Sequence, residues 1–158
     1  MRNVRVLIVE DEVVIARDLA RQLEQMGCEI LGILRDGESV LPFLQTTPPD
    51  IVLMDIHLAG AMDGIETVRE VKKEYDIPVV YLTANTDDSS FAKAKATRPF
   101  AFVEKPFKLR SLLRTFELLI EQIMAGEEEE GTEEKEASFV LKNSIFVRDK
   151  GKMSKILI

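Results

Sequence analysis

The chain has 158 residues, of which 46% are apolar and 31% charged, so it can form one packed domain with a short appendage in water. No apolar stretch reaches the roughly 20 residues that a membrane-spanning helix needs, and no signal peptide precedes the first strand-like segment. Cys28 is the only cysteine, which excludes an internal disulfide and a thiolate metal cluster and favours a cytoplasmic location.

The first fifty residues predict strands that alternate with helices. Residues 4–9 are mostly apolar and β-branched, as expected of a buried strand. An amphipathic helix follows and ends before Gly27, a C-cap residue. A second strand is expected at 29–34 and a short helix at 38–45, which Pro48 and Pro49 stop.

The next seventy-five residues continue the alternation. We predict a strand at 51–55, a helix at 65–75, a strand at 79–82, a helix at 90–97 with its N-cap within 86–89, a strand at 100–103 and a helix at 108–124. The helix at 90–97 has only Phe91 as a large apolar residue and should be the least firmly packed element. Five strands alternating with five helices predict a doubly wound α/β fold, in which helices cover both faces of a five-stranded parallel sheet. The alternation leaves the strand order open.

The last part of the chain differs in composition. Residues 127–136 carry seven Glu and one Lys, a charge of −6, and are expected to form a solvated spacer. Residues 137–158 carry +4 and alternate in a β-hairpin-like pattern, with strands expected at 139–141, 144–147 and 153–158. A hairpin of about twenty residues cannot bury its own apolar face. The tail therefore either packs on another surface or begins a truncated domain.

Polar residues follow four of the five predicted strands. Glu10 and Asp11 follow the first strand, Asp55 ends the third, and Lys105 comes after the fifth. Thr83, followed by the small Ala84, ends the fourth. In a parallel sheet all of these residues face one crevice at the carboxyl edge.

This set of residue types suits phosphoryl transfer to a carboxylate. Three clustered acids repel one another, and Mg²⁺, which prefers oxygen ligands, relieves that repulsion. Glu10, Asp11 and Asp55 could supply its oxygens, with Asp55 as the best nucleophile. Lys105 and the hydroxyl of Thr83 would contact phosphoryl oxygens.

Each residue also has a simpler interpretation. An acid at a strand end is often a turn former or a helix cap, and Thr83 could merely satisfy backbone groups. Lys105 could be an exposed lysine before a proline. His57, the only histidine, is expected to be an exposed loop residue with its side chain pointing away from the metal. The conjunction of four suitable strand ends favours the functional interpretation.

These residues resemble the receiver domain of two-component response regulators over residues 4–124. The resemblance rests on Glu10-Asp11, Asp55, Asp63-Gly64, Thr83-Ala84 and Lys105-Pro106-Phe107. It implies a flavodoxin-like sheet of order 2-1-3-4-5 and Asp55 as the phosphoacceptor from a sensor histidine kinase.

The resemblance also implies further site residues. The backbone carbonyl of His57 would join Glu10, Asp11 and Asp55 around Mg²⁺. Thr83 and Phe102 match the switch hydroxyl and the switch aromatic, and Phe102 would turn inward on phosphorylation. Phenylalanine at this position lacks the hydroxyl of the tyrosine often found there. The loop from His57 to Gly64 lacks the proline often seen after the phosphoacceptor and is slightly long.

The tail weakly resembles the first strands of a LytTR-type DNA-binding domain, in residues 144–148 and 152–156. The expected division is thus a receiver domain at 1–125, an acidic linker at 126–137 and a β-rich tail at 138–158. DNA binding would occur only through the missing remainder of the C-terminal domain.

The function expected from the sequence is a Mg²⁺-dependent response regulator. Phosphorylation of Asp55 would switch a protein-interaction surface, favour a homodimer and control output, expected to be transcription. The chain would be no enzyme beyond its own phosphotransfer and autodephosphorylation. Alternatives are a standalone receiver that signals by protein contact and a receiver-like binding module that is not phosphorylated. A phosphohydrolase is disfavoured because His57 replaces the second acid of the Asp-x-Asp motif.

Overall fold

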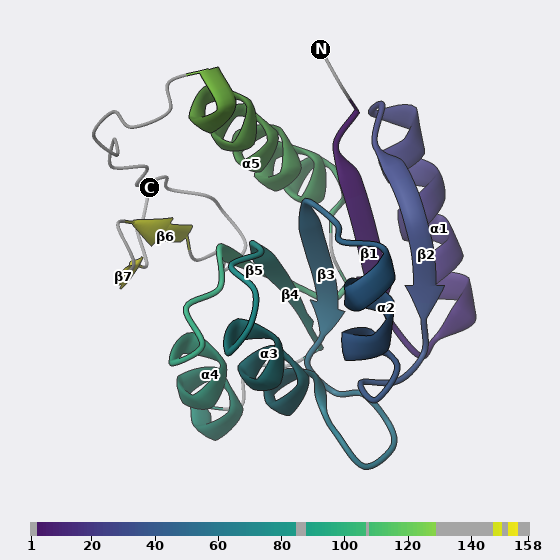
Figure 1. Ribbon diagram of the computed structural model, residues 1–158, viewed down its shortest axis with the longest axis vertical. Coiled ribbons are helices and arrows are strands. Elements are labelled where there is room, and N and C mark those ends of the chain that lie inside the picture. The colour runs from purple at the N-terminus through teal and green to yellow at the C-terminus, as the bar shows by residue number, and fades with distance from the viewer. Residues whose placement is uncertain (1–2, 85–87, 107, 129–146, 150–151, 155–158) are drawn as a thin grey trace.

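The computed structural model describes residues 3–84, 88–106, 108–128, 147–149 and 152–154. Its central five strands are parallel in the order 2-1-3-4-5, which confirms the predicted fold class (Figure 1). They are β1 (Arg5–Val9), β2 (Glu29–Leu34), β3 (Ile51–Asp55), β4 (Val79–Thr83) and β5 (Ala101–Glu104). β3 and β4 are buried along their whole length, as their continuous apolar runs require.

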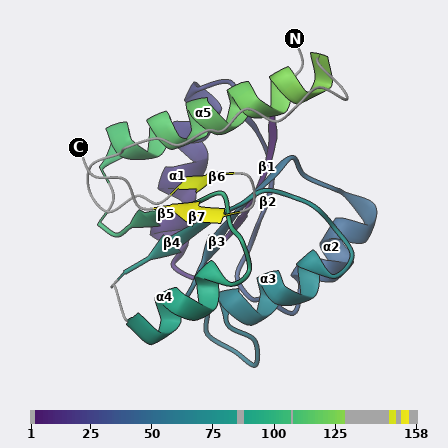
Figure 2. The same ribbon diagram turned by 90° about the vertical axis from the view of Figure 1, so that its left-hand side faces the viewer.

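The helices cover both faces of this sheet. They are α1 (Val13–Gln25), α2 (Val40–Thr46), α3 (Gly64–Lys72), α4 (Asp88–Lys95) and α5 (Leu109–Glu128). Figure 2 shows α1 and α5 on one side of the sheet and α2, α3 and α4 on the other. Part of the predicted N-cap of α4, residues 85–87, lies outside the described residues. None of the described helices is both long and apolar enough to cross a membrane.

Alternate residues of each strand supply two hydrophobic cores. On one face, Ile8 and Leu53 pack with Leu19 of α1 and Phe116 of α5. On the other, Val9, Met54, Tyr81 and Phe102 pack with the apolar sides of α2, α3 and α4. Cys28 is a buried member of the first core, as predicted, and burial raises the pKa of its thiol. Apolar burial on both faces fixes the strands and therefore fixes where their carboxyl ends lie.

Two helix ends show why the chain turns where it does. α1 ends in a Schellman motif, in which Gly27 adopts a φ of +98° and donates to the Glu24 carbonyl, while Cys28 donates to Leu23. α3 begins with a capping box: Asp63 accepts from the Glu66 amide, and the Glu66 side chain accepts from the Asp63 amide. The predicted C-cap at Gly27 is thus confirmed.

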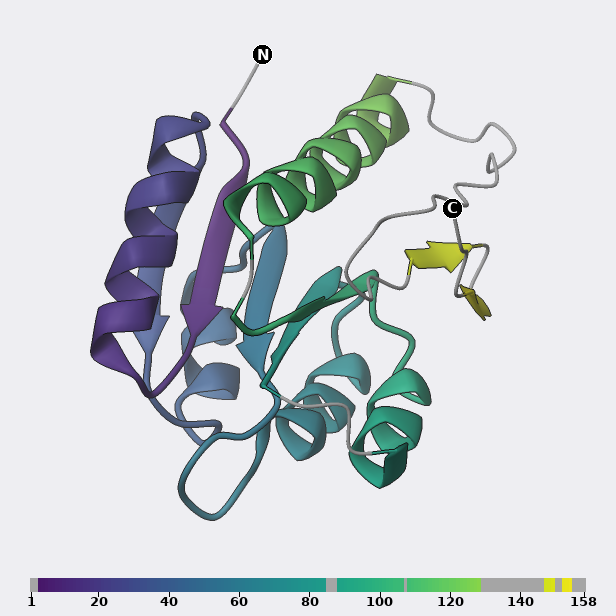
Figure 3. The same ribbon diagram turned by 180° about the vertical axis from the view of Figure 1, so that it is seen from behind.

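The described part of the tail adds two short strands to the sheet. β6 (Val147–Asp149) pairs antiparallel with β5 through Ala101 and Val147, and β7 (Lys152–Ser154) pairs with β6 (Figure 3). The tail therefore pairs with its own domain, a question that the sequence left open. The rest of the predicted tail strands lies outside the described residues. α5 runs to Glu128, into the range predicted as linker.

Candidate phosphoacceptor site

The end of β1 places two acids at the carboxyl edge of the sheet. Glu10 is fully buried, its amide donates to the Leu34 carbonyl, and its Oε2 accepts a 3.1 Å hydrogen bond from the amide of Glu12. Asp11 is half-buried, and its Oδ2 accepts from the amide of Ala59 at 3.3 Å. Asp11 thus links the end of β1 to the loop that follows β3.

Asp55 ends β3 and is 3% exposed. Its Oδ1 accepts a 3.0 Å hydrogen bond from the amide of His57, which fixes the orientation of the carboxylate. The side chain of His57 is exposed, as predicted. Gly64 packs so closely on Asp55 that a Cβ atom at this position would overlap the Asp55 carbonyl oxygen. The first residue of α3 must therefore be a glycine.

β4 and β5 bring the hydroxyl and the ammonium group to the same edge. Thr83 is 6% exposed at the end of β4, and Ala84 beside it is exposed. The amide of Lys105 donates to the Thr83 carbonyl at 2.6 Å, so the two residues lie on adjacent backbones. The peptide bond from Lys105 to Pro106 is cis.

Lys105 is the centre of the polar contacts in this pocket. Its Nζ lies 2.7 Å from Glu10 Oε1, 3.4 Å from Asp55 Oδ2 and 3.8 Å from Glu12 Oε1. The lysine side chain is 11% exposed, whereas that of Glu12 is 64% exposed. Lys105 is therefore a largely buried cation among acids and not an exposed lysine before a proline.

Burial and charge shift the proton affinities in the pocket. Burial raises the pKa of Glu10 to about 7; the neighbouring Asp55 adds to this, while hydrogen bonds from Lys105 and from the Glu12 amide oppose it. Burial also disfavours the charged form of Lys105, but its contacts with Glu10 and Asp55 outweigh burial and raise its pKa. Lys105 is thus charged at neutral pH. Binding of a proton or of a further cation would offset the cost of burying an ionised Glu10.

The three predicted metal ligands lie close together. Glu10, Asp11 and Asp55 each offer a carboxylate oxygen, and these oxygens lie within 4.8 Å of one another. Such a set of hard oxygen donors fits Mg²⁺, which would keep several waters beside two or three protein ligands. Burial, together with the neighbouring Asp55, disfavours the ionised form of Glu10 and raises its pKa, and a bound cation would offset this.

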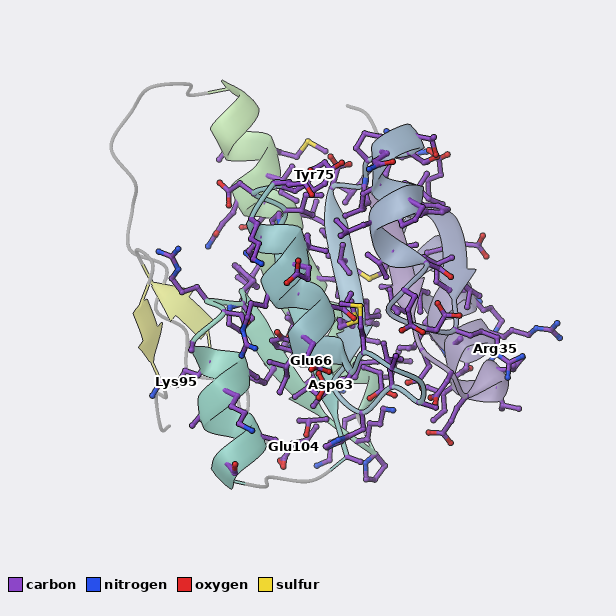
Figure 4. All side chains as sticks on the ribbon, turned by 60° about the horizontal axis from the view of Figure 1, so that its bottom comes forward. Arg35, Asp63, Glu66, Tyr75, Lys95 and Glu104 are labelled. Atoms are coloured by element: carbon purple, nitrogen blue, oxygen red, sulfur yellow. The ribbon has the colours of Figure 1, made fainter. Side chains whose placement is uncertain are left out.

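Other acids shape the surrounding loop (Figure 4). Glu38 Oε1 accepts from the Met62 amide at 3.2 Å, and Asp63 and Glu66 lie together at the start of α3. The sequence prediction missed Glu38 and assigned no role to Glu12, although Glu12 directly follows the two acids that it singled out. Asp63 was noted only as part of a motif, and its capping box is a clear pattern of Asp followed three residues later by Glu.

Phe102 is packed in an aromatic cluster below the site. The ring is 1% exposed and contacts the rings of Tyr81 and Phe91, at centroid distances of 5.4 Å and 4.7 Å. The ring is thus already buried in the unphosphorylated structure, and the inward turn expected on phosphorylation stays a prediction. Without a hydroxyl, Phe102 leaves no polar atom in the core, and complete burial is favourable.

The fold and the pocket define an α/β domain with an acid and lysine site at the carboxyl edge of its sheet. The response regulator receiver domain family matches residues 6–117, and the chain belongs to this family. Transcriptional regulatory protein PdtaR of Mycobacterium tuberculosis is 34% identical over 116 residues, which cover 73% of this chain and 56% of that protein. The chain thus spans about half the length of the curated relatives it matches.

Solved structures agree with this assignment. The signal receiver domain of a modulated diguanylate cyclase from Desulfovibrio desulfuricans G20 is 35% identical, with a TM-score of 0.72 over 80% of this chain and 99% of that one. NtrX from Brucella abortus is 30% identical, with a TM-score of 0.72 over 80% of this chain and 28% of that one. The predicted receiver domain is confirmed. The family match ends at residue 117, so the LytTR-type tail stays a prediction.

Proposed function

We propose that Asp55 accepts a phosphoryl group from the phosphohistidine of a sensor histidine kinase. The observation that carries this proposal is the placement of Asp55: a buried carboxylate 3.4 Å from Lys105, within 4.8 Å of two further carboxylates. An aspartate with a purely structural role would need neither the lysine nor the two further carboxylates beside it. Carboxylates in such settings form aspartyl phosphates, and the reaction depends mainly on positioning and charge neutralisation.

The transfer itself requires one bond to form and one to break. An oxygen of Asp55 forms the new O–P bond while the N–P bond to the donor histidine breaks, and the imidazole keeps the electron pair and takes up a proton. The His57 amide holds Oδ1 of Asp55, which limits rotation of the carboxylate. This restriction lowers the entropy cost of reaching the in-line geometry.

Glu10, Asp11 and Asp55, with the backbone carbonyl of His57, would hold Mg²⁺. When bound, the ion would neutralise charge on the acids and on the transferred group. Lys105 would pair with one phosphoryl oxygen, and its raised pKa keeps it protonated for that role. The Thr83 hydroxyl would donate to another oxygen, and the small side chain of Ala84 would leave room for the group.

The output is proposed to be a change in protein contacts that controls transcription. The phosphoryl group would draw Thr83 toward it, alter the surface of α4, β5 and α5, and favour a homodimer. The name of the M. tuberculosis relative, a transcriptional regulatory protein, supports this output. Replacing Thr83 with Ala should preserve phosphorylation and weaken dimerisation; an undiminished dimer response would remove Thr83 from the switch.

The first test is intact-mass spectrometry after incubation with acetyl phosphate. We expect the mass of one phosphoryl group only with Mg²⁺, and none on Asp55→Asn. Asp18→Asn is the matched control, because Asp18 is a surface acid that pairs with Arg21 of the same helix, and this variant should be phosphorylated normally. Phosphorylation of Asp55→Asn would place the acceptor elsewhere. If acetyl phosphate adds nothing, a phosphorylated histidine kinase domain is the second donor, and failure with both would overturn the proposal.

A further inference from the structure

Tyr81 contacts α4 through a buried hydrogen bond. The residue is fully buried on β4, and its hydroxyl lies 2.8 Å from Oγ1 of Thr97, just beyond the C-terminal end of α4. Thr97 Oγ1 also donates to the Ala94 carbonyl at 2.6 Å. A threonine hydroxyl has one proton, and that carbonyl can only accept, so Tyr81 must be the donor. The two bonds join the sheet to the last turn of α4.

The ring of Tyr81 belongs to a cluster of three aromatic side chains. Tyr81 and Phe102 lie opposite each other on β4 and β5 and stack with an interplanar angle of 24°. Phe91 of α4 also contacts Phe102, with an interplanar angle of 45°. The hydroxyl that the receiver resemblance leads one to expect at position 102 is thus present in this cluster on the neighbouring strand.

α4 has few other apolar side chains with which to hold its position. Of the eight residues from Asp88 to Lys95, Ala94 is buried and Phe91 is partly buried. After Thr97, the chain leaves the helix through Arg98, whose φ of 55° is a conformation that non-glycine residues rarely adopt. The Tyr81–Thr97 bond therefore acts where the helix is weakly packed and the backbone turns sharply.

The two ends of α4 are held differently. Figure 4 marks the last turn of the helix by Lys95 and the end of β5, at the site, by Glu104. The N-terminal end of α4 follows Thr83 and Ala84 in the chain. The C-terminal end of α4 is hydrogen-bonded, through Thr97, to Tyr81. Tyr81 lies two residues before Thr83 on the same face of β4. A shift of Thr83 would therefore be transmitted to the N-terminal end of α4 along the chain that follows it. The same shift could reach the hydrogen-bonded C-terminal end only along β4.

We propose that Tyr81 is a positioning residue that fixes the C-terminal end of α4, so that activation moves the N-terminal end about this fixed point. The fixed end is a property of the unphosphorylated fold. The movement on activation rests on the function proposed above. The two parts are tested separately, so that failure of phosphorylation does not obscure the first.

The first test measures amide hydrogen exchange in the unphosphorylated full chain by NMR. The amides of Ala96, Thr97 and Arg98 donate to helix carbonyls at 3.0–3.2 Å and report on the bonded end. Tyr81→Phe removes the hydroxyl and keeps the ring, and the loss of one buried hydrogen bond should speed exchange at these amides about fivefold. Tyr75→Phe, which changes the only other tyrosine, should leave them unchanged.

A second pair of variants guards against a general loss of stability. Thr97→Val removes the other partner of the bond and should reproduce the local effect. Thr115→Val is the matched control, because Thr115 is also buried and its hydroxyl donates to the Ser111 carbonyl of its own helix. If hydrogen exchange at residues 96–98 is equal in Tyr81→Phe and the wild type, Tyr81 does not fix the C-terminal end of α4.

The movement of α4 on activation is tested on protein that intact-mass spectrometry shows to carry one phosphoryl group. The beryllofluoride complex of the protein is the alternative sample. Phosphorylation of the wild type should change exchange in the first half of α4 and leave residues 96–98 within about twofold of their unphosphorylated rates. In Tyr81→Phe, which should be phosphorylated at the wild-type rate, both halves should change. Equal changes along the whole helix in the wild type would overturn the fixed point. Without phosphorylation, the exchange data on the unphosphorylated chain still decide whether the end is fixed.

Discussion

Lys105 donates a hydrogen bond to Glu10 across 2.7 Å, and this pair joins the end of β5 to the end of β1. Replacing Lys105 with Met leaves two buried carboxylates without their cation. We expect urea denaturation at neutral pH without metal to show a loss of about 3–5 kcal/mol. Lys73→Met is the control, because Lys73 pairs with Glu70 on an exposed helix surface, and it should cost less than about 1 kcal/mol. Equal losses would mean that Lys105 has no special stabilising role.

Glu10 predicts a pH dependence of stability. Its pKa of about 7 in the folded chain lies above the ordinary value of 4.5, so the folded state holds this proton more tightly. The resulting stabilisation is complete below pH 4.5 and is lost as the pH rises through about 7. In EDTA, the free energy of unfolding of the wild type minus that of Glu10→Gln should fall by roughly 3 kcal/mol across this range.

The control for this titration is Glu24→Gln, at an exposed position of α1. It should track the wild type at every pH. Added Mg²⁺ should raise the stability of the wild type above pH 7, where Glu10 is mostly ionised, through preferential binding to the folded state. A pH-independent difference between the wild type and Glu10→Gln would contradict the raised pKa.

The close packing of Gly64 predicts a sharp contrast between two glycines. Gly64→Ala places a methyl group on the Asp55 carbonyl and should destabilise the fold by about 1–3 kcal/mol. Gly126→Ala, in α5, meets nothing within 4 Å and should stabilise by up to about 1 kcal/mol. Thermal unfolding of both variants checks this order, and a neutral Gly64→Ala would show that α3 can move away from β3.

The pairing of β6 with β5 predicts that the tail keeps the edge of the sheet covered. A chain ending at Glu128 would expose the backbone groups of β5, and open edge strands pair with other chains. We expect its mass, measured by light scattering, to rise with concentration more steeply than that of the full chain. Identical behaviour of the two chains would show that the tail does not limit self-association.

The positions of the strands were predictable because both cores require continuous apolar runs. The predicted bounds of β2 and β3 match the structure residue for residue. The order of the strands came from the resemblance, since alternation is compatible with several topologies. With that order, Asp55 and Lys105 lie at the same carboxyl edge of the sheet, at the ends of strands separated by β4.

Other features depend on tertiary distances that no local pattern encodes. Lys105 lies 2.7 Å from Glu10 and 3.4 Å from Asp55, whereas the sequence analysis paired it only with a phosphoryl oxygen. The burial of Phe102 depends on the rings of Tyr81 and Phe91 from two other elements. Tyr81 itself was counted as an ordinary strand residue, because nothing in the sequence shows that its hydroxyl meets Thr97.

The Glu10–Lys105 pair also affects the stage of folding at which the pocket forms. Its two members are 95 residues apart in sequence, so the pocket is a contact of high sequence separation and forms only after slow, non-local strand pairing. During synthesis, Glu10, Asp11 and Asp55 leave the ribosome long before their cation. A nascent chain therefore has the aspartate proposed as acceptor but lacks the lysine, and the proposed phosphoryl transfer would become possible only with completion of the parallel sheet.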